Sequence, residues 1–590
     1  MENRLDKKWF LELLPYWIVC LLAELAEISA WVGPYPSMKK ILIACLIPHV
    51  LILICGAIRP VHRWMVAIEQ FLWKQLKTLK NHQWKKGLLM VGADVVLACV
   101  SERILTWIAN GSLTAPYHFR KAVFSFTVWF ILSLLIVFRD ELRTKIELVV
   151  FLVILSTGTA YVTTVPVSCG ISWDDEMHFH FSLYLEHILH GRMTYADADI
   201  LNKYYTTALE HDIYTEETHA QWLAQLNADA ASGAYGPDGR MWPVIEYWCY
   251  IPGAIGLTIG NALHLPYALV FMLGKWCNLL LYAVLIYFSM KRIKTGKMLV
   301  ASVAMLPPCI LMAASYSRDP YMIGFIMLGF CYFIGELQEP NKQLKLWDMA
   351  IILGAFVIGV MPKAIYVPLI LIVLFMPKEK FASVRQCRIY RICVVLATLL
   401  VLATFAVPFV SSGGGAVEDT RGGSEVSASG QTAFILGHPL QYTMVLLNFL
   451  RSYLSLSKAV TDLGSMHYFG TASFVPLLIV LLFVVAFTDR EERYDRSVKA
   501  SVRVAGLILS LGAVCLAATA MYIAFTAVGS EEIMGCQYRY LLQVMFPMLY
   551  LVFWIPMNNR MKKEWYRGII LAILSVVELH ALWTQCIAGF

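Results

Sequence analysis

The sequence predicts an all-α integral membrane protein with about fifteen transmembrane helices. Of its 590 residues, 59% are hydrophobic and only 15% are charged, whereas soluble proteins are nearer half apolar and a quarter charged. Apolar runs of roughly 20 residues, the length that crosses a bilayer, recur along the chain. The basic residues behind the net charge of +7 lie in short blocks between these runs. That pattern is typical of membrane orientation and argues against nucleic-acid binding.

Each predicted span begins near the start of an apolar run. In chain order the starts are Leu11, Ile41, Gly87, Ala122, Ile146, Tyr267, Met298, Tyr321, Asp348, Ala364, Ile392, Ala472, Ser501, Leu541 and Gly568. The first run carries Glu12, Glu24 and Glu27 and lacks a small-residue cleavage site, so we expect a span there and no signal peptide. The fourteen cysteines show no paired C-x-x-C spacing, which predicts neither a zinc site nor a disulfide framework.

Six basic blocks set the predicted orientation. They are residues 59–86, 139–145, 291–297, 378–391, 489–499 and 558–567. Positive residues near span ends favour the cytoplasm, and a cytoplasmic N-terminus puts all six blocks there. Residues 167–242 then form a first external loop, and residues 411–471 form a second. The Gly- and Ser-rich start of the second loop is expected to be mobile.

Two apolar segments fit this topology only if they do not cross the membrane in the usual way. A crossing at residues 242–263 would move the basic block 291–297 to the external side, so we expect a helix in the outer interface, where its Trp and Tyr residues suit the depth. The runs 350–360 and 364–376 are short and flank Pro362 and Lys363. They predict two short helices that meet near the outer surface, with a single broken helix as the alternative.

Unusual polar residues gather on the predicted external side. They lie in WDDEMH (173–178), in SYSRDP (315–320), at Lys363 and in GSEEIMGCQYRY (529–540). Charged groups at membrane depth are costly, so they usually line a cavity or pair with one another.

The three adjacent acids Asp174, Asp175 and Glu176 need cations nearby, because neighbouring carboxylates repel one another when all of them are ionised. Arg318, Lys363 and Arg539 are the candidate counter-charges. A carboxylate can act as a general base on a hydroxyl, and cations can hold a phosphate leaving group, with Arg able to bind it through two hydrogen bonds.

Plainer interpretations stay open at each position. The acids suit the first turn of a helix, with Asp174 or Asp175 as its N-cap. Arg318 and Asp319 suit a local ion pair, and the side chain of Lys363 can extend to the membrane surface. A divalent metal bound by Asp175, His178 and an outside ligand is a further alternative, although this spacing is unspecific.

Six stretches together resemble a family of bacterial polytopic membrane proteins of largely unassigned function, which is related to the GT-C glycosyltransferases that use polyprenyl-phosphate sugars. The stretches are ISWDDEMHF (171–179), MWPVIEYWCYIPGAIGLTIGNAL (241–263), GKWCNLLLYAVLIYFSMKR (274–292), LPPCILMAASYSRDPYMIG (306–324), MPKAIYVPLILIVLFMPKEK (361–380) and GCQYRYLLQVMFPML (535–549). Their order and spacing carry the resemblance more than any one motif does.

The resemblance implies a GT-C-like transferase core over residues 146–590 with external interfacial helices. It implies a catalytic aspartate in the acidic motif. The acidic pair of the motif can be aligned with Asp174 and Asp175 or with Asp175 and Glu176. Asp175 belongs to both alignments, so it is the expected base, assisted by Asp174 and Glu176. The expected substrate-binding residues are His178, Arg318, Asp319, Lys363, Gln537, Arg539 and Tyr540. Unlike the family pattern, the motif follows the fifth span, so residues 1–145 form an added four-span module that the resemblance does not cover.

The predicted function is a multi-pass glycosyltransferase of the cell membrane, with a cytoplasmic N-terminus and an external active site. Its donor would be a polyprenyl-phosphate sugar, and its acceptor a cell-envelope glycan, a lipid or a protein. A single displacement would invert the anomeric carbon. The alternatives are a polymerase or ligase of lipid-linked glycans and a transporter or flippase of lipid-linked sugars. The sequence indicates no cofactor other than the divalent metal given above as an alternative, and it names neither the sugar nor the acceptor.

Overall fold

The computed structural model describes residues 38–78, 83–110, 116–167, 172–190, 216–231, 245–411, 425–553 and 559–587, together with residues 13, 16, 17, 20, 114 and 557. Every regular element in these ranges is a helix, which confirms the predicted all-α class for the described part of the chain. The chain forms two compact units, Met1–Val165 with Lys562–Phe590 and Pro166–Met561. The sequence suggested a boundary at residue 145, whereas the compact units divide near residues 165 and 562.

The first unit joins the two ends of the sequence. Its helices are α2 (Met38–Ala57), α3 (Arg59–Thr78), α4 (Gln83–Asn110), α5 (Phe119–Val137), α6 (Arg139–Thr144), α7 (Ile146–Thr164), α25 (Lys563–Ala581) and the π-helix η9 (Leu582–Ile587). Helix α25 packs against α5, α6 and α7. The Arg567 guanidinium donates to the carbonyl oxygens of Leu142 and Arg143 at 2.9 and 2.8 Å. The glutamates at positions 12, 24 and 27 lie outside the described residues.

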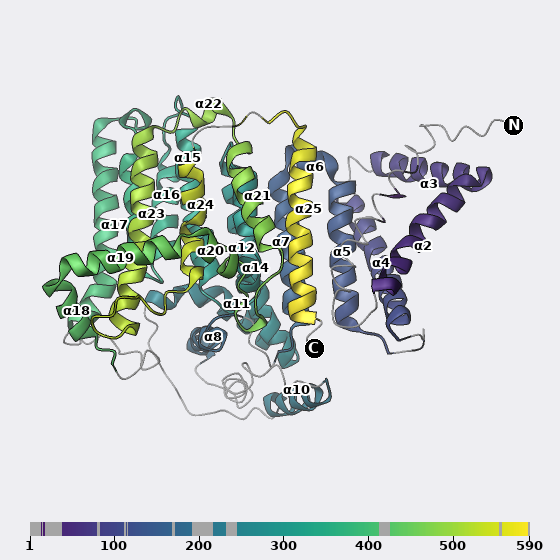
Figure 1. The fold of residues 1–590 in the computed structure, drawn as a ribbon, viewed down its shortest axis with the longest axis horizontal. Helices are drawn as coiled ribbons and strands as arrows, with labels where there is room; N and C mark the ends of the chain where they lie inside the picture. The colour runs from purple at the N-terminus through teal and green to yellow at the C-terminus, as the bar shows by residue number, and fades with distance from the viewer. Residues whose placement is uncertain are drawn as a thin grey trace. The chain divides into compact units, whose positions relative to one another are not determined.

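The second unit is a bundle of helices with short helices at its ends. The helices are α8 (Asp175–His190), α10 (Glu216–Ala231), η3 (Ile245–Tyr250), α11 (Ile251–Ala262), α12 (Tyr267–Arg292), α13 (Lys297–Ala304), α14 (Pro307–Ala313), α15 (Asp319–Leu337), α16 (Leu346–Val360), η4 (Ala364–Phe375), η5 (Lys378–Lys380), α17 (Val384–Ser411), α18 (Ala428–Gly437), α19 (Pro439–Tyr453), α20 (Leu456–Asp462), η7 (His467–Phe469), α21 (Val475–Thr488), α22 (Glu492–Asp495), α23 (Ala500–Phe525), η8 (Tyr538–Leu541) and α24 (Leu542–Val552). Helices α15, α16, α17, α23 and α24 stand side by side, with α8 and α11 at one end and α22 at the other (Figure 1).

We call these two ends the site end, where α15 and α24 begin, and the basic end, where α17 begins. The basic blocks 291–297, 378–391 and 489–499 all lie at the basic end, because each joins or begins helices there. Several of their cations are paired: Arg292 with Glu339 at 3.0 Å, and Arg490 with Asp495 at 2.9 Å. The predicted clustering of these three blocks on one side is therefore found in this unit.

The centre of the unit is a broken apolar helix. Helices α13 and α14 are separated at Leu306, which is extended with φ −67° and ψ 139°. Pro307 and Pro308 follow at the first positions of α14, where their missing N–H groups cost nothing. The side chains from Met298 to Ala314 are fully buried, so this segment forms the core against which the other helices pack.

Helix α16 and the 3-10 helix η4 form an antiparallel hairpin. The Leu344 N–H before α16 donates to the Lys380 carbonyl after η4 at 2.7 Å, so both outer ends of the pair lie at the basic end. The chain therefore reverses at residues 361–363, as expected for two short helices. The 12 residues of η4 rise roughly 24 Å, close to the roughly 22 Å of the 15 residues of α16.

Helix α11 lies at the site end and does not cross the bundle. Its 12 residues rise roughly 18 Å, which is shorter than a bilayer core of about 30 Å. Ile251, Ile255, Ile259 and Leu263 are exposed at four-residue intervals along one face. The length of α11 agrees with the expectation that this segment does not cross the membrane. In the second predicted loop, α18 and α19 meet at 107°, and residues 412–424, where mobility was predicted, lie outside the described residues.

Seven described helices are long and apolar enough to span a membrane, or nine if each bent pair counts as one span. The predicted count of about fifteen is not reached in the described residues, because several apolar runs form shorter or broken helices. The run at Met298 is divided between α13 and α14, and α16, η4 and α21 have 15, 12 and 14 residues. Length and composition support a multi-pass membrane protein.

Candidate functional site

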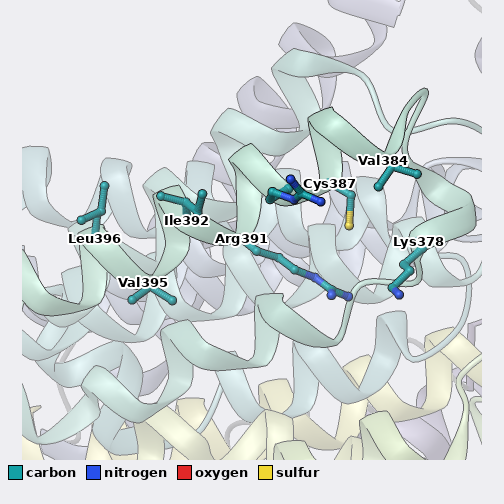
Figure 2. A pocket seen from close by; sticks show the side chains of 8 residues that line it. Lys378, Val384, Cys387, Arg391, Ile392, Val395 and Leu396 are labelled. Atoms are coloured by element: carbon teal, nitrogen blue, oxygen red, sulfur yellow. The ribbon is translucent and has the colours of Figure 1, made fainter.

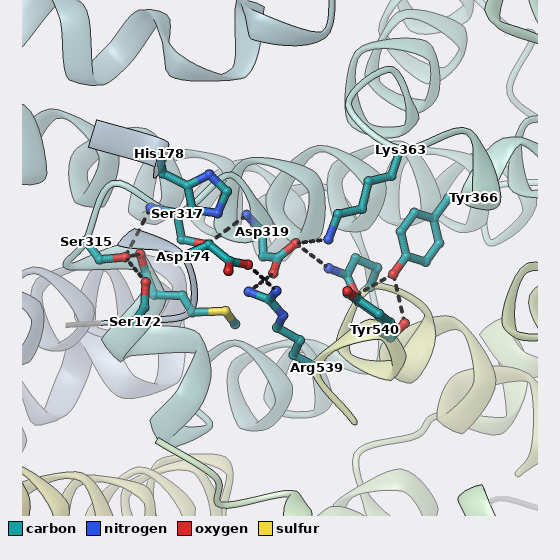
Figure 3. A network of polar contacts seen from close by, with 12 residues as sticks. Ser172, Asp174, His178, Ser315, Ser317, Asp319, Lys363, Tyr366, Arg539 and Tyr540 are labelled. Atoms are coloured by element: carbon teal, nitrogen blue, oxygen red, sulfur yellow. Dashed lines mark hydrogen bonds and ion pairs between the residues drawn. The ribbon is translucent and has the colours of Figure 1, made fainter. Parts of the chain in front are cut away.

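Four segments that are distant in sequence meet at the site end of the second unit (Figure 3). They are residues 172–174 before α8, residues 315–319 before α15, the turn before η4 and the short helix η8. Each lies where a helix begins or the chain reverses, so its polar side chains need not enter the apolar bundle.

Asp319 is the centre of this network. It is the first residue of α15, where the positive end of the helix dipole favours an acid, and its side chain is fully buried. Its Oδ1 lies 3.1 Å from Lys363 Nζ, and its Oδ2 lies 3.4 Å from Arg539 Nη1. A buried carboxylate of this kind depends on such partners.

Arg539 bridges Asp319 to a second carboxylate. Its Nη2 donates to Asp174 Oδ2 at 3.0 Å, and only 5% of its side chain is exposed. The guanidinium carbon lies 5.2 Å from the ring centre of Trp173 and 5.5 Å from that of Tyr540. Burial opposes the charged form, but Asp319, Tyr540 and Asp174 outweigh it and hold the pKa of Arg539 above its ordinary value.

Asp174 is more accessible than Asp175. Its side chain is 41% exposed, and its backbone adopts a left-handed conformation with φ 53°. Aspartate tolerates this region better than most residues do, and such conformations cluster at functional sites. The turn directs this carboxylate towards Arg539 (Figure 3).

Asp175, the base expected from the sequence, is fully buried. Its Oδ1 accepts a hydrogen bond from the Tyr316 N–H at 2.8 Å, and its Oδ2 lies 4.0 Å from Lys275 Nζ. These contacts hold the start of α8 against the segment before α15. Glu176 lies in the first turn of α8 and is partly buried.

His178 faces the same network as a neutral ring. Its Nδ1 lies 2.7 Å from the Tyr250 hydroxyl. Burial lowers the pKa of His178 to about 3, and the positive charges of Arg318 and Arg539 act in the same direction. Among the described residues, no group of three or more His, Cys, Asp or Glu side chains could hold a metal ion.

Two further cations complete the charge distribution. Arg318 is the N-cap of α15, and its buried Nε has no hydrogen-bond partner among the described residues. Lys363 Nζ lies 4.5 Å from the ring centre of Tyr540. Burial lowers the pKa of Lys363 to about 7; Asp319 opposes this shift, while Arg318 and Arg539 add to it.

The structure adds residues that the sequence did not single out. Ser172 Oγ lies 2.7 Å from Ser315 Oγ, which accepts from the Ser317 N–H at 3.1 Å. The Tyr366 hydroxyl donates to the Tyr540 carbonyl at 2.9 Å and lies 3.0 Å from the Gln543 amide. Ser172, Ser315 and Ser317 lie in the motifs ISWDDEMHF and SYSRDP, in which only the charged residues and His178 were predicted to form a site. Tyr366 and Gln543 lie in apolar runs that gave no such signal.

A cavity of about 140 Å³ adjoins Arg539. Its lining residues are Trp173, Pro308, Asp462, Leu463, Ser465, Gln537, Tyr538, Arg539 and Leu542. The predicted residue Gln537 thus lies on the wall of this cavity, and its carbonyl accepts from the Tyr453 hydroxyl at 2.8 Å. The cavity places a guanidinium, an acid and aromatic rings around one small space.

Comparison with known proteins gives a family for this arrangement. Residues 158–545 match the family described as "Predicted membrane protein (DUF2142)", and all four segments of the site fall within them. No curated protein and no solved structure matches the chain. The match covers more than half of the sequence, so this chain belongs to the DUF2142 family of membrane proteins.

Proposed function

We propose that the protein is a glycosyltransferase that moves a sugar from a polyprenyl-phosphate carrier to a hydroxyl of a cell-envelope glycan, lipid or protein. The observation that carries the proposal is the position of Arg539. Its guanidinium contacts the accessible Asp174 and the buried Asp319 and lines a cavity. The guanidinium of Arg539 thus lies beside a candidate base, Asp174, and beside the cations around Asp319, which are a candidate phosphate site.

The charges around Asp319 suit a phosphate diester. Lys363 and Arg539 pair with the carboxylates of Asp319 and Asp174, and a third cation, Arg318, precedes Asp319 in the chain. Fully protonated, these cations exceed the acids by one charge, which a phosphodiester would neutralise. Burial is the main reason for the lowered pKa of Lys363, the charges of Arg318 and Arg539 add to it, and a bound anion would raise this pKa again.

The geometry favours Asp174 over Asp175 as the group that acts on the acceptor. In the proposed step the acceptor oxygen attacks the anomeric carbon and gives its proton to Asp174. The bond between the anomeric carbon and the phosphate oxygen breaks, and its electron pair stays on that oxygen. Polyprenyl phosphate leaves, and Lys363 and Arg539 stabilise its negative charge. The anomeric carbon is inverted. Asp175, which is held by Tyr316, acts as a positioning residue.

The charge distribution of the second unit supports an external site. The basic blocks collect at the end opposite the site, and positive residues favour the cytoplasmic side. With that orientation, the site end faces the outer leaflet, where a lipid-linked donor and an envelope acceptor can both reach it.

A transporter would be expected to place polar groups at a helix break near the middle of the membrane. The chain has such a break between α13 and α14, but it is formed by Met305, Leu306 and two prolines. The charged network lies instead at the end of the bundle, which favours the transferase.

The test is Asp174→Asn in cells, with envelope glycans compared by mass spectrometry against the intact gene and a gene deletion. We expect loss of the same sugar decoration as in the deletion, at an unchanged protein level. Glu531→Gln, an exposed acid before η8, is the matched control and should leave the glycans unaltered. Normal glycans in Asp174→Asn, or in the deletion itself, would overturn the proposal.

A further inference from the structure

A second hollow lies away from the network around Asp319, along the first half of α17 (Figure 2). It has a volume of about 460 Å³. Its lining residues are Lys378, Val384, Cys387, Arg388, Arg391, Ile392, Val395 and Leu396. We call it the α17 groove.

The α17 groove is polar at one end and apolar at the other. Lys378 and Arg391 stand towards the basic end of the bundle, whereas Ile392, Val395 and Leu396 lie deeper along the helix (Figure 2). Arg388, one turn before Ile392, also lines the groove. From Val384 to Leu396 the helix rises roughly 18 Å. This length matches a headgroup followed by the first part of an acyl chain.

The cations of the groove differ from their neighbours in having no acidic partner. Lys380, two residues from Lys378, lies 3.0 Å from Glu336 and donates to the Glu339 carbonyl at 2.8 Å. Lys378, Arg388 and Arg391 form no ion pair with any described residue, and the buried Nε of Arg391 has no hydrogen-bond partner among them. The groove therefore offers positive charge to an outside anion.

Helix α17 is also the least buried of the seven described candidate spans. Only 22% of its apolar window is buried, against 33% to 78% for the other six described spans. A soluble phosphate compound could use the cations but would leave the apolar half of the groove uncovered. A membrane phospholipid matches both halves.

We propose that the α17 groove binds an anionic phospholipid of the leaflet at the basic end, with its phosphate on Arg388, Arg391 and Lys378 and an acyl chain on Ile392, Val395 and Leu396. Basic pockets beside membrane helices recognise such headgroups through charge. The site is independent of the proposed transferase activity, because it shares no residue with the network around Asp319.

The test is native mass spectrometry of the full chain in detergent, titrated with phosphatidylglycerol or with phosphatidylcholine of the same acyl chains. We expect preferential binding of phosphatidylglycerol. Arg388→Gln with Arg391→Gln should weaken it by roughly 25-fold, because each cation near the surface contributes about five-fold. Leu396→Asn, which changes no charge, should also weaken it.

Arg385→Gln is the matched control, since Arg385 is exposed on the same helix but does not line the groove. It should bind phosphatidylglycerol as the unaltered chain does. Equal binding of the two lipids, an equal loss in Arg385→Gln, or full displacement of the lipid by millimolar glycerol phosphate would overturn the proposal.

Discussion

At the scale of single residues, Arg539 unites groups from distant parts of the chain. Its partners Asp174 and Asp319 lie 365 and 220 positions away, and both contacts are made by a side chain that is nearly buried. Removal of one member of a buried ion pair leaves the other with insufficient counter-charge, which is more costly than loss of a surface pair. The network should therefore matter for stability as well as for chemistry.

We expect Arg539→Gln to lower stability by about 3–5 kcal/mol, because Asp319 would keep only Lys363 as a close cation. The measurement is the melting temperature of the purified chain in detergent. Arg493→Gln is the control: its side chain is 72% exposed, and its pair with Glu491 should contribute less than about 1 kcal/mol. Similar melting temperatures for both variants would contradict a structural role of the Arg539 bridge.

Lys363 predicts a pH dependence of donor binding. A lysine is charged below its pKa, and here the pKa is about 7, so affinity for a phosphodiester should fall as pH rises from 6 to 9. A bound anion raises the pKa, which moves the decline above pH 7. The measurement is the Kd of a short-chain polyprenyl-phosphate sugar across this range. Lys363→Arg, which stays charged throughout, should flatten the profile; an unchanged decline would assign the titration to another group.

The different surroundings of the neighbouring residues Asp174 and Asp175 show what the sequence could not predict at this scale. Residue type and motif order predicted that Asp174, Asp319, Lys363, Arg539 and Tyr540 share a site, and the structure brings them together. They did not distinguish Asp174 from Asp175, because adjacent residues of a turn can point into solvent or into the core. That choice depends on the left-handed backbone at Asp174 and on the Tyr316 N–H, which are three-dimensional facts.

At the scale of elements, α12 and the segment before α15 are held together by Tyr316. Its hydroxyl donates to the Phe271 carbonyl at 2.7 Å, and its N–H donates to Asp175. A Cβ on Gly274 would lie 2.2 Å from the same hydroxyl. Only glycine leaves room for this side chain beside the helix.

Gly274→Ala should therefore displace Tyr316 and lower stability by roughly 1–3 kcal/mol, as overpacking usually does. Gly354→Ala on α16 is the control, because a Cβ there meets nothing within 4 Å, and alanine should be neutral or stabilising in a helix. The two melting temperatures in detergent give the answer. A Gly274→Ala chain as stable as Gly354→Ala would mean that Tyr316 can move without cost.

Loop charge predicted the elements at the site end better than it predicted their internal geometry. The segment around α11 was excluded from the spans because a crossing would reverse the positive residues downstream, and the helix found is too short to cross. The hairpin of α16 and η4 was one of two open alternatives. Its 3-10 conformation gave no sequence signal, since an apolar run of this length fits either helix type.

At the scale of the whole molecule, the family match and the second unit nearly coincide. The match covers residues 158–545, and the unit covers Pro166–Met561. Composition and basic blocks predicted a helical membrane protein. They did not predict that the last helix belongs with the first unit, because that packing joins residues more than 400 positions apart.

The first unit predicts that its C-terminal helix stays bound after the chain is cut. A protease site inserted between Met561 and Lys562, which are both exposed, separates α25 from the second unit's sequence. We expect the fragment 562–590 to co-elute with the remainder on size-exclusion chromatography in detergent, because α25 packs on α5, α6 and α7. Uncut protein is the control, and release of the fragment would contradict this packing.

The 3-10 conformation of η4 sets the depth of Lys363. Twelve residues wound as an α-helix would be roughly 6 Å shorter than the same residues wound as a 3-10 helix. With its far end fixed by the Leu344–Lys380 hydrogen bond, an α-helical η4 would withdraw the ammonium group from a carboxylate that it now meets at 3.1 Å. The greater rise per residue of the 3-10 helix therefore sets the distance from the Leu344–Lys380 hydrogen bond to Lys363. For a helix of 12 residues, this distance determines whether the ammonium group reaches Asp319.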